Sequence, residues 1–103
     1  FAIYDAYPVS PGHSLIVPKK EVNSFFLLNS EEYNECFNLL RDVRNLLINK
    51  FQVNDFNIGI NDGCNAGQTI NQCHLHIIPR YQGDIDNPRG GIRGEIPSKK
   101  NYP

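Results

Sequence analysis

NQCHLHIIPR, residues 71–80, is the segment whose pattern most constrains the fold of this chain. Polar and apolar side chains alternate along it, which is the period of a half-buried β-strand. Side chains two residues apart in a strand project from the same face, about 6.5–7 Å apart along the chain. One face therefore carries the polar members of the segment: Gln72, His74 and His76. The opposite face carries its apolar members: Cys73, Leu75 and Ile77.

A second alternating segment lies just before it. Residues 55–62, DFNIGIND, alternate large apolar residues with small or polar ones, which predicts a strand with one polar face. Residues 63–69, GCNAGQT, are a run of small residues typical of a loop. We expect the strands on either side of this loop, 55–62 and 70–81, to pair antiparallel as a hairpin.

One helix is predicted, over residues 28–51. Asn29 or Ser30 can cap it, and the acidic residues Glu31 and Glu32 favour the positive end of the helix dipole. Apolar residues recur at helical spacing and are expected to face the core. These residues are Tyr33, Phe37, Leu40, Val43 and Leu47.

The remaining segments complete a small antiparallel sheet. Residues 1–7 predict a strand that ends at the turn 8–13, and residues 14–20 predict another that ends near Pro18. From Gly83 onward the chain is rich in Gly, Pro and charge and is expected to be a loop or a tail. One helix against a mostly antiparallel sheet predicts the α+β class.

Composition indicates a soluble, globular chain. It has 103 residues, enough for one domain, and a net charge of -1 gives no electrostatic case for binding nucleic acid or a membrane. No apolar run reaches the length of a transmembrane helix. The three cysteines, Cys36, Cys64 and Cys73, form no disulfide framework or CxxC clasp, so we expect a reducing compartment, the cytoplasm.

Both ends look cut. The chain starts at Phe1, inside a predicted strand and without an initiator methionine, and it finishes on IPSKKNYP with no terminating element. We therefore expect a single domain, residues 1–103, that is truncated at its N-terminus and is a candidate fragment of a longer chain.

The loop 61–69, NDGCNAGQT, is a candidate anion site. It offers the backbone N–H groups of three small residues, which allow close approach. These residues are Gly63, Ala66 and Gly67. Asn61 and Thr69 add neutral donors at the same mouth. Beside two imidazoles on one strand face, such donors suit a phosphoryl group, because an imidazole nitrogen can attack phosphorus while a second imidazole binds its oxygens.

Three segments together resemble the histidine triad family of nucleotide hydrolases and transferases. They are GQTINQCHLHIIPRYQGD, SPGHSLIVPK and INDG, and DNPRGGIRGEIP is similar to the tail of a diadenosine tetraphosphate hydrolase-like subgroup. The family pattern is His-φ-His-φ-His-φ-φ, where φ is apolar. The resemblance implies an antiparallel sheet of about five strands with one main helix, and a symmetric homodimer.

The resemblance also implies catalytic roles. His74 matches the nucleophile, which forms a nucleotidyl-histidine with the α-phosphate, and His76 matches the residue that contacts that phosphate or the leaving oxygen. His13 matches a fourth histidine that supports the network. Gln72 stands at the first triad position, where the family has histidine. These roles need no catalytic metal and no cofactor.

Further positions match the family's substrate contacts. Asp5 corresponds to the residue that binds the ribose hydroxyls. Asn61, Gly67 and Thr69 correspond to phosphate contacts, and Gln68 lies among them. The expected ligand is a purine nucleotide of the AMP or GMP type, presented as a dinucleoside polyphosphate or a nucleoside phosphoramidate.

Alternatives stay open at this point. Gln72 can donate and accept hydrogen bonds but cannot carry a proton at neutral pH, so the chain could instead be a nucleotide-binding module with weak catalysis. A His-x-His strand can also supply two metal ligands, with His13 as a third. Without the surrounding motif, His74 and His76 would be ordinary strand residues.

Overall fold

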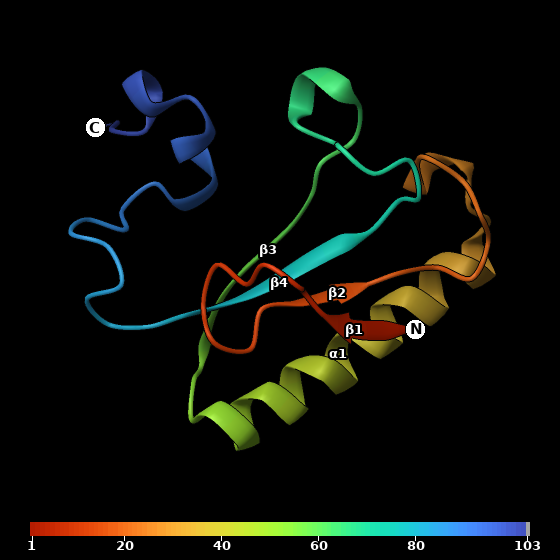
Figure 1. The fold of residues 1–103 in the computed structure, drawn as a ribbon, viewed down its shortest axis with the longest axis horizontal. Coiled ribbons are helices and arrows are strands. Elements are labelled where there is room, and N and C mark those ends of the chain that lie inside the picture. Colours follow the sequence, from red (N-terminus) through yellow and green to blue (C-terminus); the bar gives the residue numbers. More distant parts are fainter. Residues whose placement is uncertain (103) are drawn as a thin grey trace.

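The computed structural model describes residues 1–102. Four strands form one antiparallel sheet in the order β1-β2-β4-β3 (Figure 1). The strands are β1 (Ala2–Tyr4), β2 (Ser14–Ile16), β3 (Asp55–Ile60) and β4 (Leu75–Arg80). A single long helix, α1 (Ser30–Phe51), packs on β2 and β4. The α+β class is confirmed, and within the described residues the sheet has four strands instead of about five.

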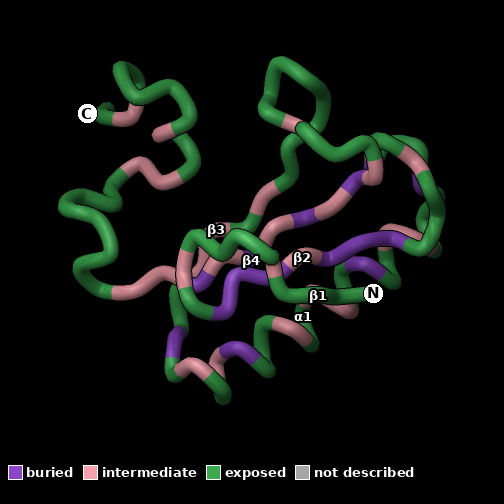
Figure 2. Tube along the Cα trace, in the orientation of Figure 1, coloured by how far each residue is buried: buried purple, intermediate pink, exposed green. Residues whose placement is uncertain are grey.

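The strand that carries the histidines lies inside the sheet. β4 pairs with β2 on one side and with β3 on the other, so the predicted hairpin of β3 and β4 is confirmed. Regular pairing begins at Leu75, five residues later than predicted, yet exposure already alternates from Gln72 onward. Cys73, Leu75 and Ile77 are buried on the helix side, as their spacing predicts (Figure 2).

The start of α1 follows its sequence signals closely. The Asn29 side chain accepts a hydrogen bond from the Glu32 backbone N–H (2.9 Å), and the Glu32 carboxylate accepts one from the Asn29 N–H (2.8 Å). This reciprocal pair is a capping box, which satisfies two backbone donors that a helix leaves free at its first turn. Asn29 is thus the N-cap, one of the two candidates.

The core face of α1 differs from the prediction at Phe37. That side chain is 55% exposed, whereas Cys36 is 7% exposed and packs with Ile16 and Leu75 of the sheet. Successive helical residues are about 100° apart around the axis, so the face centred on Cys36 turns Phe37 toward its edge. Tyr33, Leu40, Val43 and Leu47 do face inward.

A tight turn connects β1 to β2 and positions the first site residues. Gly12 has φ +89°, and a Cβ atom there would lie 3.1 Å from the Phe51 ring and 3.2 Å from Pro79. The turn is also tied to β4, because the Ser10 hydroxyl donates to the Pro79 carbonyl (2.6 Å). Only glycine suits that conformation and space, so Gly12 fixes the path of the chain into His13.

The rest of the described chain is irregular. Short 3-10 turns are η1 (Phe25–Leu27), η2 (Cys64–Ala66), η3 (Gly91–Glu95) and η4 (Pro97–Lys99). The segment between β3 and β4 and the segment after β4 both rise from the side of the sheet opposite α1 (Figure 1). No helix in residues 1–102 has the length and apolar character needed to cross a bilayer.

Candidate active site

Two separate parts of the chain bring three histidines together on the face opposite α1. His76 lies on β4 between Leu15 of β2 and Gly59 of β3. His13 ends the turn before β2, and its ring centroid is 5.2 Å from that of His76. His74 directly precedes β4, with its centroid 5.1 Å from that of His76. The two histidines of the segment therefore share a face, as predicted.

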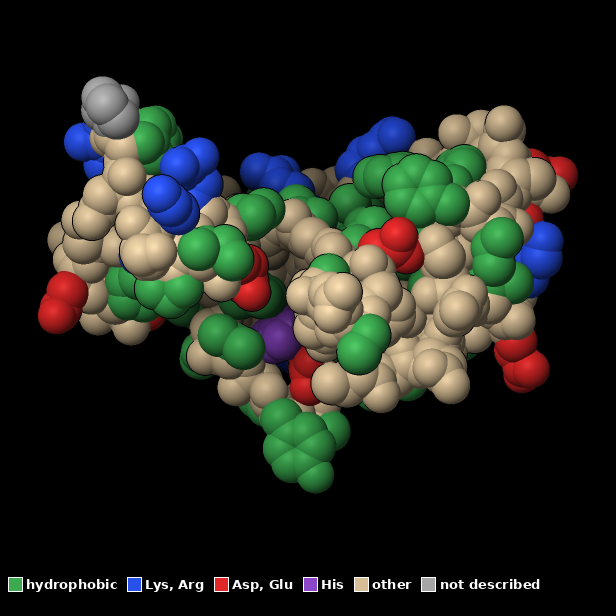
Figure 3. Space-filling model, turned by 90° about the horizontal axis from the view of Figure 1, so that it is seen from above, with side chains coloured by type: hydrophobic (Ala, Val, Ile, Leu, Met, Phe, Trp, Pro, Cys, Tyr) green, Lys and Arg blue, Asp and Glu red, His purple; other side chains and the backbone are tan. Residues whose placement is uncertain are grey.

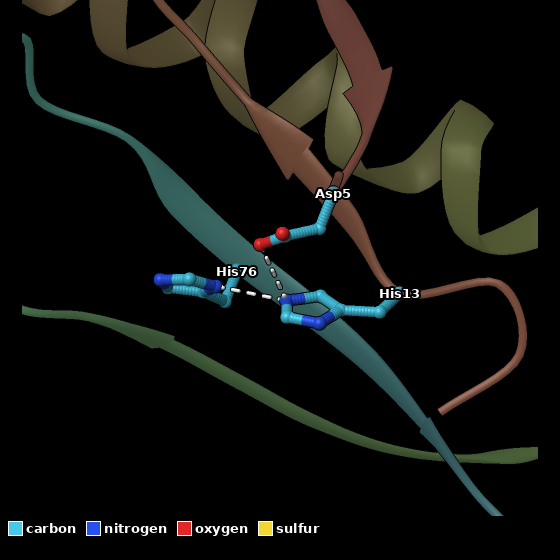
Figure 4. A group of neighbouring side chains, drawn as sticks. All are labelled: Asp5, His13 and His76. Carbon is cyan, nitrogen blue, oxygen red and sulfur yellow. Dashed lines mark hydrogen bonds and ion pairs between the residues drawn. The ribbon is translucent and has the colours of Figure 1, made fainter. Parts of the chain in front are cut away.

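A backbone hydrogen bond sets the protonation pattern of His13. The Val9 N–H donates to His13 Nδ1 (3.0 Å), so this nitrogen carries a lone pair and Nε2 carries the hydrogen. His13 Nε2 then donates to His76 Nδ1 (2.9 Å), with a carboxylate oxygen of Asp5 3.5 Å away (Figure 4). His76 accepts at Nδ1, and its own hydrogen is therefore on Nε2.

A second backbone hydrogen bond sets the opposite pattern in His74. Its Nδ1 lies 3.0 Å from the Gln72 carbonyl oxygen, which can only accept. Nδ1 therefore carries the hydrogen, and Nε2 is left with a lone pair. Neighbouring rings thus present different groups: His74 Nε2 can attack an electrophile, and His76 Nε2–H can donate to an oxygen.

Burial keeps two of these rings neutral. It lowers the pKa of His13, although the Asp5 carboxylate raises it in part. Burial also lowers the pKa of His76, and the neighbouring rings of His74 and His13 lower it further against a smaller opposing effect of Asp5. A low-dielectric surrounding disfavours the charged imidazolium, so the neutral hydrogen-bond chain is maintained at neutral pH.

The amide of Gln72 binds the chain that follows β2. Its Nε2 donates to the carbonyl oxygens of Pro18 (3.1 Å) and Lys20 (3.0 Å). Nearby, the Cys73 N–H donates to the Val22 carbonyl (2.9 Å). The Gln72 side chain therefore fixes the position of its own backbone carbonyl, which in turn orients the His74 ring. This structural role requires no proton transfer.

The backbone N–H groups that the sequence suggested as an anion cradle in the 61–69 loop are engaged within the loop itself. The N–H of Gly67 donates to the Cys64 carbonyl (3.0 Å), that of Ala66 to the Gly63 carbonyl (3.1 Å), and that of Gly63 to Gln68 Oε1 (2.8 Å). These bonds close the 3-10 turn η2, so the N–H groups of the glycines are used inside the loop. Gly67 shapes this turn with φ +95° and does not offer its N–H to a ligand.

Gln68 is likewise occupied within the chain. Its Nε2 donates to the carbonyls of Asn23 (2.9 Å) and Ile70 (3.0 Å), while its Oε1 accepts from Gly63. The amide fastens the loop to the segment after β2. Asn61 and Thr69 lie at the two ends of the loop and are exposed, so their side chains are the neutral donors that a phosphate could still reach.

Gly59 is a site residue to which sequence reasoning gave no role. It pairs directly with His76 across the sheet, and a Cβ atom at this position would meet no atom within 4 Å. The missing side chain leaves open space beside the His76 ring. The sequence did contain a signal for this role: Gly59 lies in the middle of the polar face of the predicted strand 55–62, and a glycine inside a strand often marks a place where a ligand approaches closely.

The trio of Asp5, His13 and His76 has ligand-type atoms within 4.8 Å of one another. A metal on His13 Nε2 would require hydrogen on Nδ1, but Nδ1 accepts from the Val9 N–H. Binding would break that bond or need an anionic ring. The trio therefore fits a hydrogen-bond chain better than a metal, and it differs from the set of His74, His76 and His13 considered from the sequence.

Residues 1–83 match the family model of the HIT domain. The chain belongs to the HIT family. Over 82% of its length this HIT chain is 37% identical to an asymmetrical bis(5'-nucleosyl)-tetraphosphatase of Schizosaccharomyces pombe, covering 46% of that protein. It is 36% identical to a bis(5'-adenosyl)-triphosphatase of Dictyostelium discoideum, with 84% and 58% covered.

A solved structure agrees with the HIT fold. The NitFhit protein of Caenorhabditis elegans superposes with a TM-score of 0.79 at 32% identity, over 95% of this chain and 23% of that one. The chain spans about half the length of the curated relatives it matches. Family membership and fold are thus established for this domain.

We expect the free energy of unfolding to fall as the pH is lowered below 6.5, the ordinary pKa of histidine. Because burial lowers the pKa of His13 and His76 in the folded chain, the unfolded chain binds more protons there. The stability from the neutral rings is complete above 6.5 and is lost as the pH falls toward the lowered pKa of the folded state. Urea unfolding between pH 5 and 8 measures this. In the His13→Gln variant, the free energy of unfolding should fall less steeply as the pH is lowered. An equal slope in the variant and the wild type would show that His13 does not contribute to this pH dependence.

Proposed function

We propose that this HIT domain serves a nucleotide hydrolase or nucleotidyl transferase that cleaves a nucleoside 5′-phosphoryl bond. The observation that carries the proposal is the pair of opposite tautomers, with a lone pair on His74 Nε2 and a hydrogen on His76 Nε2. The relatives named tetraphosphatase and triphosphatase support a dinucleoside polyphosphate as substrate. A nucleoside phosphoramidate offers the same phosphoryl centre with a smaller leaving group.

The geometry supports a two-step displacement. The lone pair of His74 Nε2 attacks the α-phosphorus, a P–N bond forms, and the bond to the leaving group breaks with its electron pair. His76 Nε2–H donates a hydrogen bond to the oxygen on which charge develops, and the hydrogen bond from His13 Nε2–H to His76 Nδ1 keeps the hydrogen of His76 on Nε2. Water then breaks the P–N bond and releases a nucleoside 5′-monophosphate. Every group in these steps belongs to the chain, the substrate or water.

The nucleoside would lie across the sheet beside His76. Ile3 of β1 pairs with Leu15 of β2, which pairs with His76, so an apolar strip borders the imidazole and suits a purine. Asp5 is next to this strip. One of its carboxylate oxygens accepts from the Tyr7 N–H (2.8 Å), which leaves lone pairs for ribose hydroxyls. Phosphate oxygens would then face Asn61 and Thr69.

The His74→Ala variant should lose at least about 10³-fold in the rate of AMP release, because it lacks the attacking atom. Diadenosine triphosphate, diadenosine tetraphosphate and adenosine 5′-phosphoramidate are the substrates, with a chelator present. Mass spectrometry of acid-labile, base-stable adducts in the wild type should place the nucleotidyl group on His74.

AMP binding, measured by calorimetry, should persist in His74→Ala. Near-equal, slow release by the wild type and the variant would show that His74 is not the nucleophile. The chain would then be the second candidate, a nucleotide-binding module.

Gln72 bears directly on the choice between these two functions. Its bonds to the Pro18 and Lys20 carbonyls hold the peptide whose oxygen accepts from His74 Nδ1. On this arrangement the first triad position orients the nucleophile and does not transfer a proton. A glutamine there is compatible with turnover, because an amide can donate two hydrogen bonds at every pH.

The Gln72→Ala variant should lower kcat by about 10²-fold with a much smaller change in KM, because the His74 ring loses its fixed orientation. Gln72→His supplies one donor to two carbonyls and should recover only part of kcat. Steady-state kinetics on diadenosine tetraphosphate measures both. A silent wild type beside an active Gln72→His variant would favour the binding module instead.

We also propose that the domain forms a homodimer and acts in the cytoplasm. Phe37 and Leu46 on α1 are 55% and 54% exposed, and β3 is an edge strand of the described sheet. Burying such apolar side chains against a second copy is favourable. Sedimentation equilibrium should give a dimer, and Leu46→Glu should shift it toward monomer; a wild-type monomer would contradict this.

The cysteines support the proposed location in the cytoplasm. Cys36, Cys64 and Cys73 are free thiols, which is the state expected in a reducing compartment.

A further inference from the structure

The end of the chain has a charge unlike that of the rest. Residues 87–102 carry four of the ten Lys and Arg residues and one of the eleven acidic residues. The segment therefore has a net charge of +3 in a chain whose total is -1. Its cations are Arg89, Arg93, Lys99 and Lys100. The segment lies beyond residues 1–83, which match the family model of the HIT domain.

The segment stands over the histidine face of the sheet. A Cβ atom on Gly91 would lie 3.4 Å from the Asn57 amide, which places the start of η3 above β3. Asn57 is one same-face step, about 6.5–7 Å, from Gly59, the partner of His76. Figure 3 shows a histidine side chain in a hollow, with basic side chains gathered on the lobe formed by the chain's C-terminal end.

Three of the four basic side chains, those of Arg89, Arg93 and Lys100, are held in place without being neutralised. Arg93 donates to the Lys99 carbonyl (2.9 Å), and Lys100 donates to the Asn87 carbonyl (2.7 Å). The guanidinium groups of Arg89 and Arg93 lie 5.5 and 4.8 Å from the centre of the Tyr102 ring. Among residues 1–102, the Lys and Arg side chains that form ion pairs within 4.0 Å are Lys20, with Glu32, and Arg80, with Asp84. The charge of the segment is thus available to an anion.

We propose that residues 87–102 bind the phosphates of the leaving group and so favour substrates with a long polyphosphate chain. This inference rests on the proposed function, in which His74 takes the α-phosphate. The remaining phosphates must then leave the site with their negative charge. The cationic segment is the part of the described chain that can meet them, because an arginine fork matches phosphate oxygens and lysine adds a mobile charge.

The test compares two substrates that differ in their leaving groups. Diadenosine tetraphosphate loses a chain of phosphates, whereas adenosine 5′-phosphoramidate loses ammonia. The double variant Arg89→Gln/Lys99→Gln removes two cations, and Arg41→Gln removes one from the exposed side of α1 as a control. At fixed ionic strength, we expect kcat/KM of the double variant to fall about tenfold for the tetraphosphate and less than twofold for the phosphoramidate. Arg41→Gln should change neither value.

Binding of inorganic tripolyphosphate gives a second readout that does not need turnover. Calorimetry should show weaker binding to the double variant than to the wild type, with a smaller dependence on salt. Lys99→Gln alone controls for misfolding, since the Lys99 side chain makes no hydrogen bond within residues 1–102, and it should show the same trend. Equal losses on both substrates, or no loss on either, would overturn the inference.

The two proposals can fail separately. If the wild type turns over neither substrate, the proposed function fails, and tripolyphosphate binding alone decides whether the segment is a phosphate site. Turnover through His74 with unchanged tripolyphosphate binding in the double variant would retain the proposed function and reject the phosphate role of residues 87–102.

Discussion

Two hydrogen bonds between the main chain and imidazole rings underlie the whole site. The Val9 N–H donates to His13, and the Gln72 carbonyl accepts from His74. A backbone amide can only donate and a backbone carbonyl can only accept, so these contacts give the rings opposite tautomers. His76 takes its state from His13. The chemical difference between neighbouring histidines therefore comes from backbone geometry.

The surrounding structure is arranged to hold those two backbone groups. Gly12 makes the turn that directs His13 toward β4, since its positive φ and close packing on Phe51 leave no space for a side chain. On the other side, the amides of Gln68 and Gln72 fasten the segment before β4 to the chain after β2. Such constraints reduce the conformational freedom that a catalytic geometry would otherwise have to overcome.

Charge is separated within the molecule. Burial lowers the pKa of His13 and of His76, so neutral rings are favoured at these two positions. Four cations without an ion pair within the described residues lie on the C-terminal segment, and three of them, Arg89, Arg93 and Lys99, are exposed. The first environment favours neutral, hydrogen-bonding rings, and the second attracts an anion.

Features that depend only on residues close together in the sequence were determined by the sequence alone. The alternation over residues 71–80 placed His74 and His76 on one face, and Asn29 marked the start of the helix, because strand period and capping are local. The sequence could not show that the N–H groups of Gly63 and Gly67 are bonded within their own loop, nor could it predict that Phe37 turns outward. Tertiary structure decided these, along with the tautomers, because each backbone N–H and each helix face takes its partner from the packed chain, where residues as distant as Asn23 and Gln68 meet.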